Sequence, residues 1–436
     1  MKIAIVLGTR PEIIKMASII DEIRLREHEL ILIHTGQHYD HEMSDQFFEE
    51  LELPSSNYNI GVGSGFHGTQ TGKMMEGIEK VLIDEKPAIL LVQGDTNAVL
   101  AGALVASKLH IPVGHVEAGL RSFDETMPEE INRKAADVCS KLYFVPTEKS
   151  AINLSLEGIA RKKIFITGNT IVDACFRNLK IAKKRNLREF KELLNLNNIL
   201  TLTMHRAENV DNKERLKNVI DAIAKLKEFN VVFPIHPRTK KTLMNFDLYD
   251  ALDDLDHVYL IKPLGYLEFL LLLSKSSLIL TDSGGLQEEA ITLNIPALTL
   301  RYNTERPETV TAGGNILVGS DKEEIVETAN LILNDKKFSN KMKSAKNPYG
   351  DGSSGEQILN IIENTYHNNM LAIKSPDTIM QSFTTEIKMI DEDITVSEFE
   401  NKNNSLIKVA YDNDYMKFPF DDLNIKGMYI LFDKLS

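Results

Sequence analysis

The 436-residue chain contains no tryptophan and only two cysteines, Cys139 and Cys175. Neither cysteine stands in a Cys-x-x-Cys pair or a Cys/His cluster, which argues against a disulfide framework and against a zinc site. We interpret both as small buried hydrophobic residues. No apolar run approaches the roughly 20 residues that span a bilayer. The opening MKIAIVLGTRPE reaches Arg10 and Glu12 too early for a signal peptide, so we expect a cytoplasmic protein without a membrane partner.

Positive charge is also scarce. Lys and Arg number 50 against 63 Asp and Glu, which gives a net charge of −13 and a pI near 5.4. A general nucleic-acid binder needs a basic face, so we expect no nucleic-acid partner. The hydrophobic share of 43% and the charged share of 26% are those of a soluble globular protein. The length suggests two domains with an appendage.

Short apolar runs alternate with helical patterns along most of the chain. In the first half the runs are KIAIVLGT, ELILIHTG, PAILLVQGD, IPVGHVEAG, LYFVPTE and KIFITGN. The pattern restarts with NILTLTMH and continues with NVVFPIHP, HVYLIKPLG, LILTDSG and PALTL. Continuous apolar strands separated by helices predict parallel sheets covered on both faces. The fold class is therefore α/β, with two doubly wound Rossmann-like domains and a boundary near residues 168–190.

Ligands of such sheets bind at the carboxyl ends of the strands, so the cleft between the two domains is the expected site. The alternation ends near residue 366. Residues 367–436 carry acidic clusters and two weak strand candidates, SLIKVAY and GMYILFD. We interpret this segment as an appendage or a small extra domain, and we expect that the chemistry of the cleft does not require it.

Two strand-to-helix turns have the features of anion sites. In LGTRPEIIK, Gly8 lies at the turn, Pro11 begins a helix and Arg10 adds positive charge. In LILTDSGGLQEEA, Ser283, Gly284 and Gly285 open a helix, so the backbone can approach a phosphate closely. Simple helix capping by the serine is the alternative for the second turn.

A third glycine-rich stretch, GVGSGFHG, matches G-x-G-x-x-G but lacks a firm strand before it. It also lacks an acidic residue at the end of a second strand about 20 positions later, as ribose binding would need. We interpret it as a loop and expect no nicotinamide cofactor. Histidines follow two other strands: His205 precedes Arg206, and His236 precedes Arg238 by two positions. Together with the nearby turn they favour an anion pocket.

Three carboxylates stand out by position. Asp95 in VQGDT and Glu117 in GHVEAG end consecutive strands, and Glu129 in MPEEINR begins a helix one turn before Arg133. A phosphate clamp beside carboxylates favours acid/base chemistry at a sugar whose leaving group is a phosphate. No Ser/His/Asp order, Walker loop or HExxH motif occurs. The residues alone predict an enzyme acting on a nucleotide-linked sugar.

The motifs GTRPE, QGDT, HVEAGLR, PEE-NR, FITGNT-VD, HR-EN, HP, TDSGG-QEEA and TERPE occur in one order over roughly residues 1–366. Together they resemble the non-hydrolysing UDP-N-acetylglucosamine 2-epimerase family. The resemblance implies a glycosyltransferase-B-like pair of domains, residues 1–168 and 169–352, with a helix at 353–366 packing back on the first. It also implies a homodimer, and it leaves residues 367–436 without a counterpart.

The resemblance further implies interconversion of UDP-N-acetylglucosamine and UDP-N-acetylmannosamine without an organic cofactor or a metal. The route of the family is elimination of UDP to 2-acetamidoglucal, followed by re-addition. By resemblance, Asp95, Glu117 and Glu129 are the acid/base and oxocarbenium-stabilising candidates, and His205 supports the departing phosphate. Which carboxylate acts on which face of the ring is left open.

The resemblance also assigns substrate contacts and a second site. The substrate-binding positions are Arg10, Lys15, Arg133, His236, Phe269, Ser283, Gly284, Gly285 and Glu289, with the last of these on the ribose. Phe269 stacks on uracil or is a core residue of YLEFLLLL. Gln37, His38 and Gln70 match part of a site at which a second UDP-N-acetylglucosamine activates many bacterial members. The segment YDHEM is longer than usual there, so activation is left open.

Three other functions fit the same pocket. A hydrolysing epimerase would release free N-acetylmannosamine and UDP, and a glycosyltransferase would need an acceptor site. A nucleotide-sugar sensor would only bind, with the appendage carrying the signal to a partner.

Overall fold

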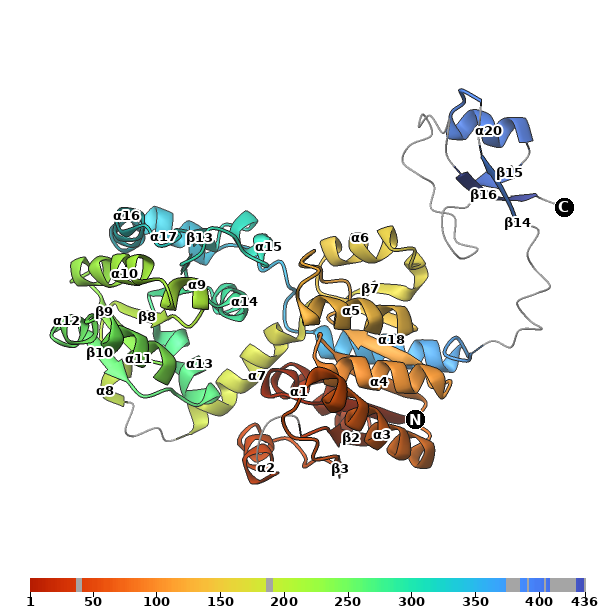
Figure 1. Cartoon of the computed structure of the whole chain (residues 1–436), viewed down its shortest axis with the longest axis horizontal. Helices are drawn as coiled ribbons and strands as arrows, with labels where there is room; N and C mark the ends of the chain where they lie inside the picture. Colours follow the sequence, from red (N-terminus) through yellow and green to blue (C-terminus); the bar gives the residue numbers. More distant parts are fainter. Residues whose placement is uncertain are drawn as a thin grey trace.

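The computed structural model contains two parallel sheets with helices on their faces and a small third sheet near the C-terminus (Figure 1). It describes residues 1–36, 41–185, 191–373, 385–389, 392–403, 405–407 and 429–434. Gln37 and His38, the predicted contacts of a second sugar nucleotide, lie outside the described residues. The predicted α/β class with two Rossmann-like halves is confirmed.

The first sheet has seven parallel strands in the order β3-β2-β1-β4-β5-β6-β7. They are β1 (Lys2–Leu7), β2 (Glu29–His34), β3 (Tyr58–Asn59), β4 (Ile89–Gln93), β5 (Val113–Val116), β6 (Leu142–Val145) and β7 (Ile164–Ile166). The strand order reverses between β1 and β4, which is the topological switch point where such sheets bind ligands.

The continuous apolar run of β1 is explained by burial on both faces of the sheet. Ile3 and Ile5 belong to the core under α1 (Arg10–Leu25), whereas Ala4 and Val6 belong to the core on the opposite face. The helices of this half are α1, α2 (His41–Glu50), α3 (His67–Glu85), α4 (Asn97–Lys108), α5 (Pro128–Cys139), α6 (Glu148–Leu156) and a short 3₁₀ turn (Arg161–Lys163). The stretch GVGSGFHG forms the predicted loop after β3, and its last two residues begin α3.

The second sheet has six parallel strands in the order β10-β9-β8-β11-β12-β13. They are β8 (Ile199–Thr203), β9 (Asn230–Pro234), β10 (Val258–Ile261), β11 (Leu278–Thr281), β12 (Ala297–Thr299) and β13 (Asn315–Leu317). Its helices are α8 (Lys191–Leu194), α9 (Ala207–Val210), α10 (Lys213–Lys225), α11 (Pro237–Asn245), α12 (Tyr249–Asp253), α13 (Tyr266–Lys275), α14 (Gly284–Thr292), α15 (Pro307–Thr311), α16 (Lys322–Asn334) and α17 (Lys336–Lys343).

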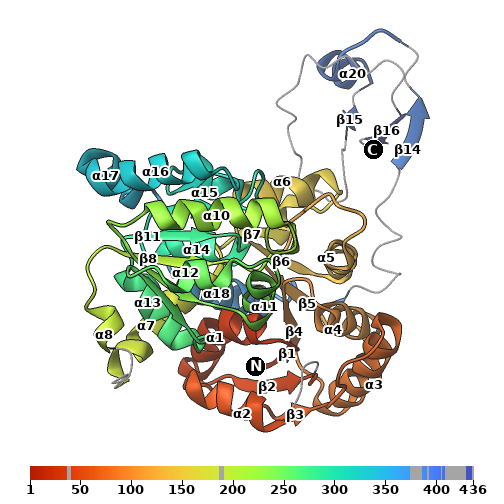
Figure 2. The same ribbon diagram turned by 60° about the vertical axis from the view of Figure 1, so that its left-hand side comes forward.

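Two long helices join the halves (Figure 2). Helix α7 (Thr170–Lys184) contacts α1 in the first half and both α13 and α14 in the second. Helix α18 (Ser354–His367) returns to pack on α1 and α7, where Glu363 accepts from Arg26 at 2.7 Å and lies 2.8 Å from His28. Leu371, beyond α18, is still buried in the same core. The main body therefore extends past residue 366.

The third sheet is antiparallel and has the order β14-β16-β15. It consists of β14 (Thr385–Met389), β15 (Ser405–Ile407) and β16 (Tyr429–Lys434), with α20 (Val396–Asn403) between β14 and β15. The last two strands are the predicted ones, whereas β14 was not predicted. Among the helices that the structure describes, none is long and apolar enough to cross a membrane.

Candidate active site

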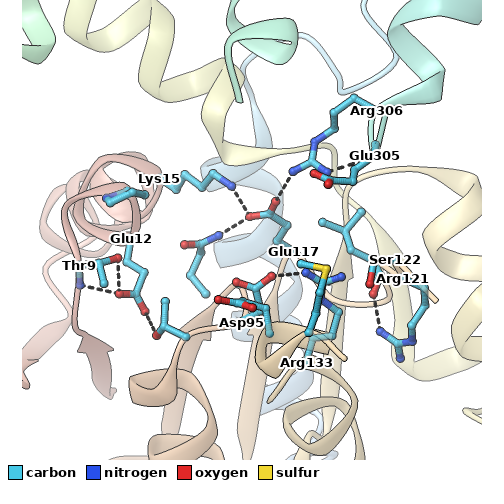
Figure 3. A pocket seen from close by; sticks show the side chains of 17 residues that line it. Thr9, Glu12, Lys15, Asp95, Glu117, Arg121, Ser122, Arg133, Glu305 and Arg306 are labelled. Carbon is cyan, nitrogen blue, oxygen red and sulfur yellow. Dashed lines mark hydrogen bonds and ion pairs between the residues drawn. The ribbon is translucent and has the colours of Figure 1, made fainter. Parts of the chain in front are cut away.

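A cavity of about 390 Å³ lies at the carboxyl ends of β4 and β5. Its walls come from the loops that follow these strands, from the start of α1 and α5, and from the segment before α15 in the second half (Figure 3). Five of the predicted site residues line it: Lys15, Asp95, Glu117, Glu129 and Arg133. The three carboxylates that the sequence singled out therefore face one space.

Glu117 is a buried carboxylate of this cavity, with 7% of its surface exposed. It follows β5 directly and has a φ of 68°, a left-handed conformation that is uncommon for a residue with a side chain. Lys15 Nζ lies 2.6 Å from Glu117 Oε2, which also accepts a hydrogen bond from Gln93 Nε2. Arg306 Nη2 approaches Glu117 Oε1 at 3.9 Å from the second half.

These cations decide the charge of Glu117. Burial disfavours its charged form, but the ammonium of Lys15 and the guanidinium of Arg306 outweigh burial, and the pKa of Glu117 is lowered. A second buried carboxylate, Glu288, binds Arg306 Nε at 2.6 Å, and burial raises its pKa. Arg306 thus bridges two buried carboxylates from α14 and β5, and Glu117 is the one held ionised.

Asp95 forms a second ion pair in the cavity. Its carboxylate contacts Arg133, which also donates to Glu130 at 2.9 Å. The backbone carbonyl of Asp95 accepts from Asn132 Nδ2 at 2.9 Å, so α5 fixes both the side chain and the backbone of this residue. The side chain of Asp95 remains about a third exposed, at 32%, and can meet a bound substrate. Glu129 is exposed in the first turn of α5 and forms part of the rim.

Glu12 anchors the turn that opens α1. It accepts from the backbone N–H groups of Gly8 and Thr9 at 2.9 and 2.6 Å, and from the hydroxyl of Thr96 at 2.8 Å. Burial raises its pKa to about 7. The Glu12 carboxylate therefore accepts the hydrogen bonds of the N–H groups at this turn. Through Thr96 it also connects α1 to the loop after β4 that carries Asp95.

The turn between β11 and α14 has the predicted open backbone. A Cβ atom built on Gly285 would meet nothing within 4 Å, so a ligand could approach the main chain there. Asp282 is fully buried and accepts from the backbone N–H groups of His205 and Arg206. It also lies 3.1 Å from Nδ1 of His205, whose side chain is half exposed. Ser283 makes no side-chain capping bond, which weakens the capping alternative.

Several predicted site residues lie outside this cavity. Arg10 is exposed, with its guanidinium 5.3 Å from the ring centre of Phe47. His236 caps α11 by accepting from Arg238 N at 3.2 Å, and Phe269 packs partly buried in a small apolar cluster. Their substrate contacts stay predictions, as do those of His205, Ser283, Gly284, Gly285 and Glu289. Gln70, a predicted contact of a second sugar nucleotide, is buried and hydrogen-bonded to Gly63 and Asn97, and its role also stays a prediction.

Residues 21–363 match the family model of UDP-N-acetylglucosamine 2-epimerase. The chain belongs to the UDP-N-acetylglucosamine 2-epimerase family. A UDP-N-acetylglucosamine 2-epimerase of Methanocaldococcus jannaschii is 54% identical over 83% of this chain and 99% of its own length. A UDP-2,3-diacetamido-2,3-dideoxy-D-glucuronate 2-epimerase of Pseudomonas aeruginosa is 43% identical over 76% of this chain and 92% of its own.

Solved structures agree with this membership. The crystal structure of the M. jannaschii UDP-GlcNAc 2-epimerase in complex with UDP-GlcNAc and UDP superimposes with a TM-score of 0.71 at 53% identity. The superposition covers 84% of this chain and 100% of the M. jannaschii chain. The resemblance predicted from the motifs is confirmed.

The sequence analysis assigned no role to Arg306, Glu305 or Gln93, although all three line the cavity and stand in the motifs QGDT and TERPE. A further signal was available. The triplet Arg-Pro-Glu occurs at 10–12 and again at 306–308, each time at the start of a helix. No cluster of three or more His, Cys, Asp or Glu side chains suited to a metal occurs within the described ranges.

Glu289 predicts a pH dependence of stability. Burial raises its pKa from 4.5 to about 7. Between these values the folded protein keeps a proton that the unfolded chain has lost, so the free energy of unfolding falls as the pH rises. We measure the free energy of unfolding by urea titration at each pH. Relative to Glu289→Gln, that of the native protein should fall by about 2–3 kcal/mol between about pH 5 and about pH 8.

The matched control for this titration is Glu323→Gln, because Glu323 is exposed in the first turn of α16. Its unfolding free energy should follow that of the native protein at each pH. If the unfolding free energies of the native protein and of Glu289→Gln depended equally on pH, Glu289 would titrate alike in the folded and unfolded states, which would contradict the prediction.

Proposed function

We propose that the protein interconverts UDP-N-acetylglucosamine and UDP-N-acetylmannosamine by inverting C2 of the sugar. One observation carries the proposal: three carboxylates, Asp95, Glu117 and Glu129, share a cavity with the cations of Lys15, Arg133 and Arg306. Family membership and the name of the relative at 54% identity support the choice of sugar.

The proposed route is elimination and re-addition. The proton on C2 has no adjacent carbonyl to acidify it, so removing it must accompany departure of UDP from C1. This step gives UDP and 2-acetamidoglucal, with a double bond between C1 and C2. UDP then returns to C1 while C2 takes a proton on the opposite face. The route needs proton-transfer groups on both faces and a site that retains UDP, and it uses no redox cofactor or metal.

The environments of the carboxylates suit different parts of this route. Glu117 is held ionised by Lys15 and Arg306, which suits stabilisation of the positive charge that develops at C1. Asp95 and Glu129 are more exposed and are the candidates for proton transfer. We assign neither to a face of the ring.

The diphosphate and nucleoside would bind the second half. The open turn at Ser283, Gly284 and Gly285 offers backbone N–H groups at the start of α14, and His205 beside Asp282 supports the departing phosphate. Further proposed contacts are Arg10 and His236 with the diphosphate, Glu289 with the ribose and Phe269 with uracil.

Incubation with UDP-N-acetylglucosamine alone tests the proposal. The epimerase gives a mixture of two UDP-sugars, which anion-exchange chromatography separates. Free N-acetylmannosamine with UDP would indicate a hydrolysing enzyme, and unchanged substrate would indicate a transferase or a sensor. UDP-2,3-diacetamido-2,3-dideoxy-D-glucuronate should be tested in parallel, because the relative at 43% identity carries that name.

We also propose a homodimer and two domains, residues 1–168 with 353–371 and residues 169–352. The appendage, predicted to begin at residue 367, then begins after Leu371. Because Leu371 is buried in the first core, we expect a chain that ends at Ile373 to fold and to epimerise at a rate similar to that of the full chain. A chain ending at Asn368 loses this burial and should be less stable by about 1.5–3 kcal/mol.

Both truncated chains should be compared with the full chain by urea unfolding, by sedimentation and by turnover. A folded chain ending at Ile373 without activity would show that the appendage completes the site.

A further inference from the structure

His115 is a buried histidine immediately behind the cavity. It lies on β5 two residues before Glu117, is fully buried, and is not among the residues that line the cavity. Both of its ring nitrogens have close oxygen partners. Nδ1 lies 2.6 Å from Asp137 Oδ1, and Nε2 lies 2.8 Å from the backbone carbonyl oxygen of Gly94.

The partners fix which way the protons point. A carbonyl oxygen only accepts, so Nε2 carries a hydrogen directed at Gly94. Asp137 already accepts from Arg121 Nη2 at 2.7 Å and from Gly119 N at 3.3 Å, as expected of an ionised carboxylate, so Nδ1 donates as well. Burial alone would lower the pKa of His115, but Asp137 outweighs burial and the pKa is raised. The ring is therefore a buried imidazolium with two donors.

The acceptor of Nε2 is the peptide that leads into Asp95. Gly94 has a φ of 82°, a left-handed conformation, and its N–H donates to Val116 O at 3.1 Å. Both ends of the Gly94 residue are thus bonded to β5, the N–H through the main chain and the carbonyl through His115. Glu117 follows the same strand directly. One side chain consequently ties the loop of Asp95 to the strand of Glu117.

We propose that His115 is a positioning residue for the reaction, whose Nε2–H holds the Gly94 carbonyl and so sets Asp95 against Glu117. The inference rests on the proposed epimerase function, because it assigns Asp95 and Glu117 to the reaction. Arg121, which lines the cavity and pairs with Glu157 at 2.7 Å, holds the far side of Asp137 in place.

Two amide replacements separate the two donors of the ring. The terminal amide of His115→Gln reaches the place of Nε2 and can donate to Gly94, whereas that of His115→Asn reaches the place of Nδ1 and can donate only toward Asp137. We expect His115→Asn to lower kcat by about 100-fold, the scale at which a misplaced reacting group costs rate. His115→Gln should retain kcat within about 10-fold, and KM should change little in both.

A double-mutant cycle with Asp95→Asn distinguishes positioning from general destabilisation. If His115 acts through Asp95, adding His115→Asn to Asp95→Asn should cost far less than it costs alone. Equal losses in both backgrounds, or equal activity of the Gln and Asn variants, would overturn the inference. An inactive native protein would instead refute the epimerase function.

The native protein offers a measurement that needs no variant. Nitrogen NMR of protein with ¹⁵N-labelled histidine should show a proton on Nε2 of His115 near pH 8, assigned by its loss in His115→Gln. A ring without a proton on Nε2 could not donate to Gly94, and the inference would fail whether or not the Asn variant folds.

Discussion

Replacement of Glu117 by Gln should lower kcat by about 10²–10⁴-fold and leave the affinity for UDP nearly unchanged. The amide keeps the size of the side chain but removes the charge that Lys15 and Arg306 hold in place. Because that charge acts on the transition state, its loss appears in turnover rather than in nucleotide binding. Steady-state kinetics and UDP titration calorimetry measure the two effects separately.

Asp95→Asn and Glu129→Gln should show the same pattern, with losses in kcat that greatly exceed losses in binding. Glu125→Gln is the matched control, because Glu125 is exposed on the same segment and does not line the cavity. Near-normal turnover in all three cavity variants would refute the acidic site and leave residues 115–133 as a capped loop.

Arg306→Met should damage both stability and turnover. Arg306 binds Glu288 at 2.6 Å and lies 3.9 Å from Glu117, so its removal leaves two buried carboxylates without their shared cation. Breaking a buried pair on one side typically costs about 3–5 kcal/mol. The pKa of Glu117 should rise because Lys15 then opposes burial without Arg306, and kcat should fall because less of the carboxylate is ionised.

The control for Arg306→Met is Lys217→Met, which removes an exposed pair with Asp221 on α10 and should cost at most about 1 kcal/mol. Adding Glu288→Gln to Arg306→Met should restore part of the stability, since it removes one of the two buried carboxylates left without a cation, but it should not restore kcat. Urea unfolding and kinetics on the same samples decide this. Full recovery of turnover in the double variant would contradict a direct role for Arg306 at Glu117.

The sequence predicted the main strands because burial on both faces leaves a continuous apolar run, as at Ile3 to Leu7 of β1. β3 and β13 were not predicted, because they have two and three residues and most of these are only partly buried, so few apolar residues mark them. β14 alternates charged and apolar residues over only five positions, and its partner β16 lies far along the chain, so local patterns do not reveal it.

The same distinction applies to the site. Asp95 and Glu117 could be predicted because they lie two residues and one residue beyond the ends of β4 and β5, and strand ends of a parallel sheet meet at one edge. Arg306 could not be predicted in the same way, because its approach to Glu117 depends on how the two halves pack through α7 and α18. His115 could not be predicted either, because the sequence places it only within a strand and does not show its contact with Gly94.

The central claim is proton exchange at C2 of a UDP-sugar, and deuterium labelling tests it most directly. The protein would be incubated with UDP-N-acetylglucosamine in deuterated water, and both UDP-sugars analysed by proton NMR and mass spectrometry. The account predicts one deuterium at C2 of UDP-N-acetylmannosamine and of the recovered UDP-N-acetylglucosamine. Formation of UDP-N-acetylmannosamine with its original hydrogen at C2 would contradict it.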